Sequence, residues 1–238
     1  MSKLPLWSTI GATLRAEIAA GHYRPGDKLP TEAELSARFG VNRHTVRHAL
    51  ASLIEADILH SRRGAGVFVV ARPTDYRLGR RVRFHQNVLS AGLVPSRRFN
   101  RLETRPADAE EARALALRTG QAVHVVEGVS LADDQPVSVF LSVFPAARFP
   151  NLPQVLPKVG SITTALAACG LNDYTRLETR LTAQLADAVL ALALRLRPGA
   201  AVLRSEAVNI DAAGTPVERG TSWFAGERVT LTIAPDQA

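Results

Sequence analysis

The chain has 238 residues, 46% of them hydrophobic, with a net charge of +7 and a pI near 10.4. This composition allows one small and one mid-sized domain with apolar cores, and it excludes a disordered chain. The charge favours an anionic partner, and the excess of Lys and Arg lies within residues 1–105. One cysteine, Cys169, excludes an internal disulfide, and no apolar run reaches the length of a membrane span, so we expect a cytoplasmic protein.

Residues 28–70 have the pattern of a winged helix-turn-helix, preceded by an apolar stripe that predicts one further helix. Thr31 and Glu34 have the spacing of a capping box, which predicts that a helix starts there. Gly40 is expected to end this helix, because a left-handed residue is needed at that point. Asn42 is then placed as the N-cap of the next helix.

This last helix carries two arginines that could read DNA. Arg43 and Arg47 are four residues apart and share a face, and a bidentate arginine–guanine pair discriminates by roughly 1–3 kcal/mol. Two arginines on an isolated helix would more often be merely solvated, but the complete motif favours DNA contact. Two short strands joined by residues 62–66 predict a wing, where Arg62 and Arg63 are expected to contact phosphates.

The stretches that carry this motif are YRPGDKLPTEAEL, FGVNRHTVRHAL and RRGAGVFV. With them, about residues 6–70 resemble the DNA-binding domain of the GntR family of bacterial transcription factors. Some members use an arginine where this chain has Ala33, so their operator half-site does not carry over. His44 stays open between a phosphate contact and simple exposure. The DNA-binding residues that we assign are Thr31, Asn42, Arg43, His44, Thr45, Arg47, Arg62, Arg63, Gly64 and Gly66.

The sequence predicts three parts: a DNA-binding domain over residues 1–72, a linker over 73–82, and an effector-binding and dimerisation domain over 83–238. The mixture of strands and a few helices with hairpin connections predicts an α+β fold with an antiparallel sheet. Strands are expected over residues 99–105, 123–131, 137–144, 174–184, 202–210, 217–224 and 228–233. Helices are expected over residues 108–117, 161–168 and 187–196.

This order, with the stretches DDQPV, RFPNL and GTPVERGT, resembles the ligand-sensing domain of the HutC branch of GntR regulators. The resemblance covers about residues 80–235 and implies a chorismate-lyase-like fold, often called UTRA. Within that branch, YRLGRRVRF and DYTRLETRLTA resemble the regulators of phosphonate utilisation, the PhnF type. A homodimer on a two-fold-related DNA operator is the expected assembly.

A polar strand is the candidate effector site. Tyr174, Arg176, Glu178 and Arg180 fall on one parity of the predicted strand and would share a face. This face could be a solvated outer surface, but the resemblance favours a pocket. Guanidinium forks match the oxygens of a phosphonate or phosphate, and Glu178 could orient them or bind an ammonium group. The other candidate effector contacts are Arg83, Ser138, Ser142 and Glu218.

Two further positions bear on the ligand. Sugar-phosphate sensors of this branch place two arginines on the strand before the Asp133 turn, at the positions of Gly128 and Ser130. Their absence argues against a sugar phosphate bound in the same way. Glu127 either turns towards a core or pairs with an arginine near the linker, and the pattern does not decide between these.

The favoured function is a DNA-binding transcriptional regulator, and we expect it to be a repressor. Its operator affinity is expected to change with a small anionic effector, a phosphonate or phosphate. The alternatives are a HutC-type regulator that senses another metabolite, such as a sugar phosphate or organic acid, and a DNA-binding module whose second domain only dimerises. A lyase-like enzyme is disfavoured, since the sequence has no metal-ligand spacing, nucleotide-binding glycine loop or nucleophile signature. No catalytic residue, metal or cofactor is expected.

Overall fold

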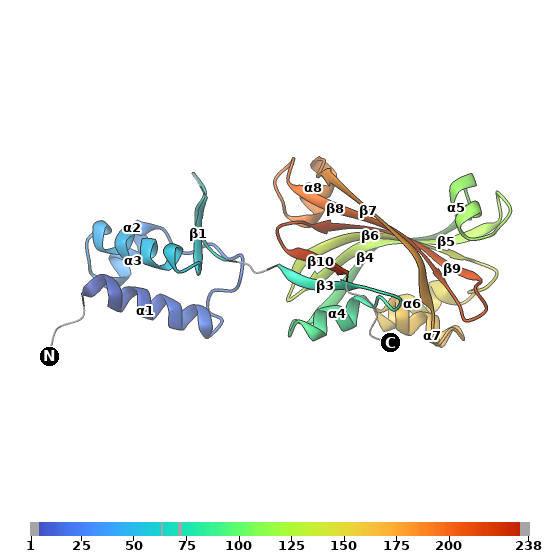
Figure 1. Ribbon diagram of the computed structural model, residues 1–238, viewed down its shortest axis with the longest axis horizontal. Coiled ribbons are helices and arrows are strands. Elements are labelled where there is room, and N and C mark those ends of the chain that lie inside the picture. The colour runs from blue at the N-terminus through green and yellow to red at the C-terminus, as the bar shows by residue number, and fades with distance from the viewer. Residues whose placement is uncertain (1–4, 63, 71–72, 234–238) are drawn as a thin grey trace. The chain divides into compact units, whose positions relative to one another are not determined.

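The computed structural model of the chain describes residues 5–62, 64–70 and 73–233, and it contains two compact units (Figure 1). The first unit is Met1–Arg72 and the second is Pro73–Ala238. Each unit is built around its own apolar clusters, so each has the internal contacts of a domain.

The first unit is a winged helix-turn-helix. Its elements are α1 (Leu6–Ala19), α2 (Glu32–Phe39), α3 (Arg43–Glu55), β1 (Leu59–Arg62) and β2 (Gly66–Val69). Leu14 of α1 packs against Leu35, Val46 and Leu53 of α2 and α3 in one core. The strands β1 and β2 pair antiparallel and form the wing.

Local hydrogen bonds fix where the two helices of the motif begin. Thr31 Oγ1 accepts from the N–H of Glu34 at 3.3 Å, and the Glu34 carboxylate accepts from the N–H of Thr31 at 2.7 Å. Gly40 adopts φ +64°, the left-handed conformation expected at a helix end. Asn42 Oδ1 accepts from the N–H of Thr45 at 2.8 Å and caps α3. The predicted capping box and N-cap are therefore confirmed.

The second unit is organised around a six-stranded antiparallel sheet in the order β4-β5-β6-β9-β8-β7. Its strands are β4 (Pro95–Pro106), β5 (Ala122–Ala132), β6 (Gln135–Pro145), β7 (Thr175–Leu185), β8 (Ala201–Ile210) and β9 (Pro216–Ala225). A separate parallel pair is formed by β3 (Thr74–Leu78) and β10 (Val229–Ile233). The helices are α4 (Phe84–Ser90), α5 (Ala109–Ala114), α6 (Leu152–Val159), α7 (Ile162–Ala168) and α8 (Ala188–Leu194).

The helices cover both faces of this sheet. Val126 packs with residues of α6 and α7, whereas its neighbour Val125 packs with residues of α5. Because successive residues of a strand point to opposite faces, α5 lies on the face opposite to α6 and α7. Figure 1 shows α4, α6 and α7 below the sheet, and α5 and α8 above it. We call the face covered by α4, α6 and α7 the inner face.

The predicted α+β fold with an antiparallel sheet is confirmed, but three details differ. Residues 74–78 were assigned to a linker and instead form β3, in which Tyr76 and Leu78 are buried. The arginines and the glycine within residues 77–81 are typical of a linker, and they outweighed the alternation of buried and exposed residues in β3. The last strand, β10, pairs with β3 and does not join the main sheet. The helices α4 and α6 were not predicted, since each is short and α6 contains prolines.

Among the described residues, no helix combines the length and apolar character that crossing a membrane requires.

Candidate functional site

The first unit presents its polar residues at the start of α3. The side chains of Arg43, His44 and Arg47 are exposed, while Val46 and Leu50 of the same helix are buried. This division follows from the helical period, which turns one face to the core and leaves the other to solvent. Thr31, Asn42 and Thr45 hold the two helix starts through their caps. Asn42 Oδ1 is thus engaged within the unit, although its amide nitrogen remains a potential donor.

Arg47 is held by a carboxylate of the preceding helix. Its Nε donates to Glu32 Oε1 at 3.1 Å and its Nη2 donates to Oε2 at 2.7 Å, which makes a two-pronged pair. Both side chains are partly exposed, at 66% for Arg47 and 35% for Glu32. This pair lowers the pKa of Glu32, mainly through the hydrogen bonds from Arg47. Sequence reasoning placed Arg47 on the reading face but did not find Glu32.

The wing contains two glycines with a left-handed backbone conformation, as expected of a tight bend that can approach a phosphate backbone closely. Gly64 and Gly66 have φ values of +74° and +117°, which residues with a side chain rarely adopt. The Arg62 guanidinium lies over the Phe68 ring, 4.9 Å from its centroid. Arg63, the other predicted wing cation, lies outside the described residues.

The second unit encloses a cavity of about 70 Å³ between the inner face of the sheet and its covering elements. Five small residues form its floor, namely Ser142, Ser205, Ala207, Gly220 and Ser222. Larger residues surround this floor, among them Tyr76, Phe84, Phe140, Tyr174 and Phe224. The cavity therefore exists because the centre of the inner face carries side chains too short to fill the space below the cover.

Arg97 of β4 is the most unusual group in the cavity wall. Its Nε and Nη1 are buried and form no hydrogen bond with any described residue. The guanidinium lies 4.5 Å from the Phe140 ring centroid and 5.1 Å from that of Phe84. Burial lowers the pKa of Arg97. A buried cation with unused donors is costly in the folded chain, and the stacking rings compensate for only part of this cost.

Glu218 of β9 lies in the same cavity wall and is 8% exposed. Its Oε1 accepts from Ser142 Oγ at 2.7 Å, and its Oε2 accepts from Asn209 Nδ2 at 2.6 Å. Arg176 Nε in turn donates to Asn209 Oδ1 at 3.3 Å. The amide of Asn209 thus connects the carboxylate to the arginine, and all four side chains line the cavity.

A bulge separates the predicted polar strand into two faces. Arg176 pairs with Asn209 and Glu178 pairs with Val208, so Leu177 is an extra residue in β7. Because Asn209 and Val208 are consecutive, their partners face opposite sides of the sheet. Glu178 and Arg180 bond to each other at 2.8 Å and lie outside the cavity. The prediction that they share a face with Arg176 is wrong.

The remaining candidates are near the cavity but do not line it. The Arg83 guanidinium lies 3.5 Å from the Tyr174 ring centroid, and its Nη2 donates to Tyr174 O at 2.7 Å. It also pairs with Asp173 at 3.2 Å, so Arg83 holds the lining residue Tyr174 in place without lining the cavity itself. Ser138 is buried opposite Phe224 in the sheet and is not among the lining residues. The structure therefore brings together Ser142, Tyr174, Arg176 and Glu218 from the predicted set.

The strand β5 carries small residues beside Arg97. Ser130 of β5 pairs with Arg97 of β4 in the sheet. At this position along the strands the guanidinium therefore comes from β4 and not from β5. At Gly128, an added Cβ would lie 2.3 Å from Arg98 O and 2.9 Å from Phe140 Cζ. No side chain fits there without displacing the backbone. Sequence reasoning missed Arg97, although one of two consecutive arginines on a strand must face the covered side.

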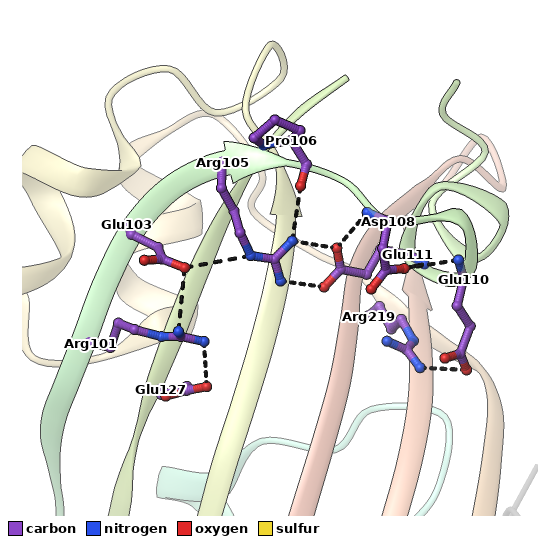
Figure 2. A network of polar contacts seen from close by, with 9 residues as sticks. All are labelled: Arg101, Glu103, Arg105, Pro106, Asp108, Glu110, Glu111, Glu127 and Arg219. Atoms are coloured by element: carbon purple, nitrogen blue, oxygen red, sulfur yellow. Dashed lines mark hydrogen bonds and ion pairs between the residues drawn. The ribbon is translucent and has the colours of Figure 1, made fainter. Parts of the chain in front are cut away.

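A second group of charged residues, on β4, β5 and α5, forms a network away from the cavity (Figure 2). Arg105 makes a two-pronged pair with Glu111, with both N–O distances at 2.7 Å, and Arg101 pairs with Glu127 at 2.6 Å. Glu111 is 2% exposed, and its contact with Arg105 holds the pKa of the carboxyl below its ordinary value. Glu127 thus pairs with an arginine of β4, not of the linker.

The described residues contain no group of three or more His, Cys, Asp or Glu side chains that could hold a metal ion. Cys169 is half-buried against the core, and burial raises the pKa of its thiol. A raised pKa disfavours the reactive thiolate, which suits a structural residue.

Comparison with known families assigns both units. Residues 6–69 match the family described as "Bacterial regulatory proteins, gntR family", and residues 90–230 match the UTRA domain. The chain belongs to the GntR family of transcriptional regulators. Its UTRA domain places it in the HutC branch. The family resemblance and the two-domain fold predicted from the sequence are thus confirmed.

Its relatives extend over nearly the whole chain. It is 36% identical to an "Uncharacterized HTH-type transcriptional regulator" of Rhizobium meliloti (strain 1021), over 96% of this chain and 94% of that protein. It is 32% identical to the "Probable transcriptional regulator PhnF" of Escherichia coli (strain K12), over 95% and 94%. The crystal structure of PhnF from Mycobacterium smegmatis superposes with a TM-score of 0.69 at 25% identity, covering 96% of this chain and all of that one. These are transcriptional regulators and not enzymes, which confirms the sequence prediction.

Proposed function

We propose that this GntR-family regulator is a repressor whose affinity for its operator changes when a small phosphonate or phosphate occupies the cavity of the UTRA domain. The observation that carries this proposal is Arg97, whose buried Nε and Nη1 have no partner among the described residues. Guanidinium groups match phosphoryl oxygens in geometry and charge, and a bound oxyanion would provide the missing acceptors.

The size of the cavity supports a compact ligand. Its volume of about 70 Å³ is well below the roughly 300–1,000 Å³ typical of sites for drug-sized ligands. A sugar phosphate would need the cover to move, whereas phosphate or a short phosphonate would not. The resemblance to PhnF proteins agrees with this size argument, but it is the cavity of this chain that favours the smaller anion.

DNA would be read by the exposed start of α3. Arg43 and Arg47 are proposed to contact base edges, while His44 and the wing residues contact the sugar–phosphate backbone. Thr31, Asn42 and Thr45 support this surface through the helix caps. Since the partner is DNA, we place the protein in the cytoplasm.

A second copy of the chain is proposed to complete the DNA-binding unit. Among the described residues, the edge strand β7 has a strand partner on one side only, and its Leu177, Leu181 and Leu185 are 63%, 40% and 70% exposed. An exposed apolar edge strand favours association with another strand. A homodimer formed here would present two copies of α3 to a two-fold-related operator.

The route from cavity to DNA-binding unit is proposed to run through the segment after the domain boundary. Tyr76, Val82 and Phe84 from this segment line the cavity, and the N–H of Arg176 donates to Arg80 O at 2.7 Å. A ligand that moves the side chain of Arg97 or Arg176 would therefore also move residues 73–84, the segment that directly follows the DNA-binding unit. Coupling of about 1–3 kcal/mol, or roughly 5–150-fold in affinity, is typical of such linkage.

The test is a gel-shift titration of the full chain. An operator is first selected from random duplex DNA, and binding is then measured at physiological salt with and without phosphate or short phosphonates, both with and without an amino group. We expect preference for the selected sequence and a change of at least about fivefold with one of these anions. Equal affinity for random and selected DNA would refute the regulator, and an operator affinity indifferent to all these anions would refute the effector.

A further inference from the structure

The cavity has a negative pole as well as a positive one. Glu218 is the acidic residue among its lining side chains, and its two hydrogen-bond donors, Ser142 and Asn209, are neutral. No described residue forms an ion pair with it within 4 Å. A buried carboxylate without a cationic partner is expensive, and each of its oxygens can accept one more hydrogen bond.

The two poles come from different strands. Arg97 is on β4 and Glu218 is on β9, and β5 and β6 lie between these strands in the sheet. The aromatic rings of Phe84 and Phe140 hold the Arg97 guanidinium in place, while Ser142 and Asn209 hold the carboxylate. The structure thus keeps a guanidinium with two buried nitrogens and a buried carboxylate in one cavity, without an ion pair between them within 4 Å.

The balance of charge limits the ligand further. Two guanidinium groups, those of Arg97 and Arg176, and one carboxylate, that of Glu218, line the cavity. A phosphate dianion would satisfy the guanidinium groups but would leave Glu218 unpaired and repel it. A phosphonate dianion that also carries one ammonium group has a single net negative charge and offers a partner to each pole.

We propose that the effector is a short amino-phosphonate, whose phosphonate group binds Arg97 and whose ammonium group binds Glu218. This inference rests on the proposed effector site and narrows its ligand class. Arg176, connected to Glu218 through Asn209, keeps the cavity net positive and draws the phosphonate in. The volume of about 70 Å³ restricts the spacer between the two charged groups to a short carbon chain.

The experiment is isothermal titration calorimetry of the full chain with 2-aminoethylphosphonate and with propylphosphonate, in which a methyl group replaces the ammonium group. A charged hydrogen bond to a buried carboxylate predicts that the amino compound binds at least about tenfold more tightly. Inorganic phosphate and β-alanine complete the series and are expected to bind more weakly than 2-aminoethylphosphonate. Equal or tighter binding of any of the three, or no binding of 2-aminoethylphosphonate, would overturn the proposal.

Two variants assign the poles. Glu218→Gln should abolish the preference for the ammonium compound, while the matched Glu178→Gln, on the opposite face of the sheet, should retain it. Arg97→Met should weaken both phosphonates by at least about tenfold, while Arg98→Met should not. If Glu218→Gln retains the full preference, the assignment is wrong; if this variant fails to fold, the four ligands on the unaltered chain decide.

Failure of this inference differs from failure of the proposed function. A chain that binds its operator and responds to phosphate and propylphosphonate as well as to 2-aminoethylphosphonate refutes only the amino-phosphonate. A chain that binds 2-aminoethylphosphonate with the stated preference but shows no DNA sequence preference refutes only the regulator.

Discussion

Arg47 in the DNA-binding unit and Arg97 in the UTRA domain are the same residue type in opposite surroundings. Arg47 is largely exposed and already has a carboxylate partner, Glu32, whereas Arg97 has two buried nitrogens without a hydrogen bond among the described residues. A partner that is exposed and weakly bound can be exchanged cheaply for a base edge. A buried and unsatisfied donor instead raises the energy of the ligand-free protein. The first arrangement suits reversible reading of DNA, and the second suits tight capture of a small anion.

A third arginine, Arg105, donates two hydrogen bonds to the buried carboxylate of Glu111. Loss of this contact gives the largest expected effect on stability. Glu111→Ala would remove both hydrogen bonds to Arg105 and the hydrogen bond that the Glu111 carboxylate accepts from the N–H of Asp108, and we expect a loss of about 3 kcal/mol in the free energy of unfolding. Urea unfolding measures this in a Trp7→Phe background, where Trp223 reports on the UTRA domain. Glu110 pairs with Arg219 at 2.7 Å and is 61% exposed, so the matched Glu110→Ala should cost less than about 1 kcal/mol. Equal losses would show that burial of the carboxylate does not distinguish the two ion pairs.

The same carboxyl predicts a dependence on pH. The folded-state pKa of Glu111 lies below its ordinary value of 4.5, so its stabilisation is fully present above that pH. It is lost as the pH falls through the lowered folded-state pKa. The difference in unfolding free energy between the unaltered chain and Glu111→Gln should therefore shrink on acidification below about pH 4.5. A difference that grows with acid would contradict the lowered pKa.

Arg47→Ala tests the exposed member of the comparison. It should weaken binding to the operator by about 2 kcal/mol and blur its sequence preference, because the proposed base contact would be lost. Thermal stability should change little, since the side chain is largely solvated. Arg63→Ala is the matched control, and gel shifts at several salt concentrations should show a uniform loss on all DNA with a smaller salt slope. Identical behaviour of the two variants would remove the distinction between base and phosphate contact.

Arg97→Met tests the buried member. Replacing a guanidinium that has two buried, unsatisfied nitrogens by an apolar chain of similar length should stabilise the ligand-free protein by about 1 kcal/mol. Differential scanning calorimetry without ligand measures the shift in melting temperature, with Arg98→Met as the exposed control. A lower melting temperature for Arg97→Met alone would mean that the guanidinium stabilises the empty cavity.

Glu32→Gln carries the smallest expected effect and sharpens the exposed case. The exposed pair with Arg47 contributes only about 0.2–1 kcal/mol, so its loss should hardly change stability. Removal of an acid beside the reading arginine should tighten binding to all DNA by a few-fold at most. Fluorescence anisotropy with operator and random duplexes measures both; weaker binding to the operator alone would instead mean that Glu32 orients Arg47 for its base contact.

The contrast also explains what the sequence could predict. The caps at Thr31 and Asn42 and the face of α3 depend on residues within one or two helical turns, so local spacing is enough to find them. The cavity depends on side chains from six strands and their cover, and on small residues whose role is to leave space. Arg97 and Glu218 are far apart in sequence, and only the pairing of strands places them in one wall. The polar strand failed as a prediction because strict alternation does not foresee a bulge.

That bulge gives one residue an effect out of proportion to its chemistry. Leu177 pairs with no residue of β8, yet its presence sends Arg176 to one side of the sheet and Glu178 with Arg180 to the other. If Leu177 instead paired with Val208 as an ordinary strand residue, Glu178 and Arg180 would lie on the side that Arg176 now faces, and would add one charge of each sign there. Which charges of β7 face the cavity side of the sheet therefore depends on this bulge as well as on the residue types of the strand.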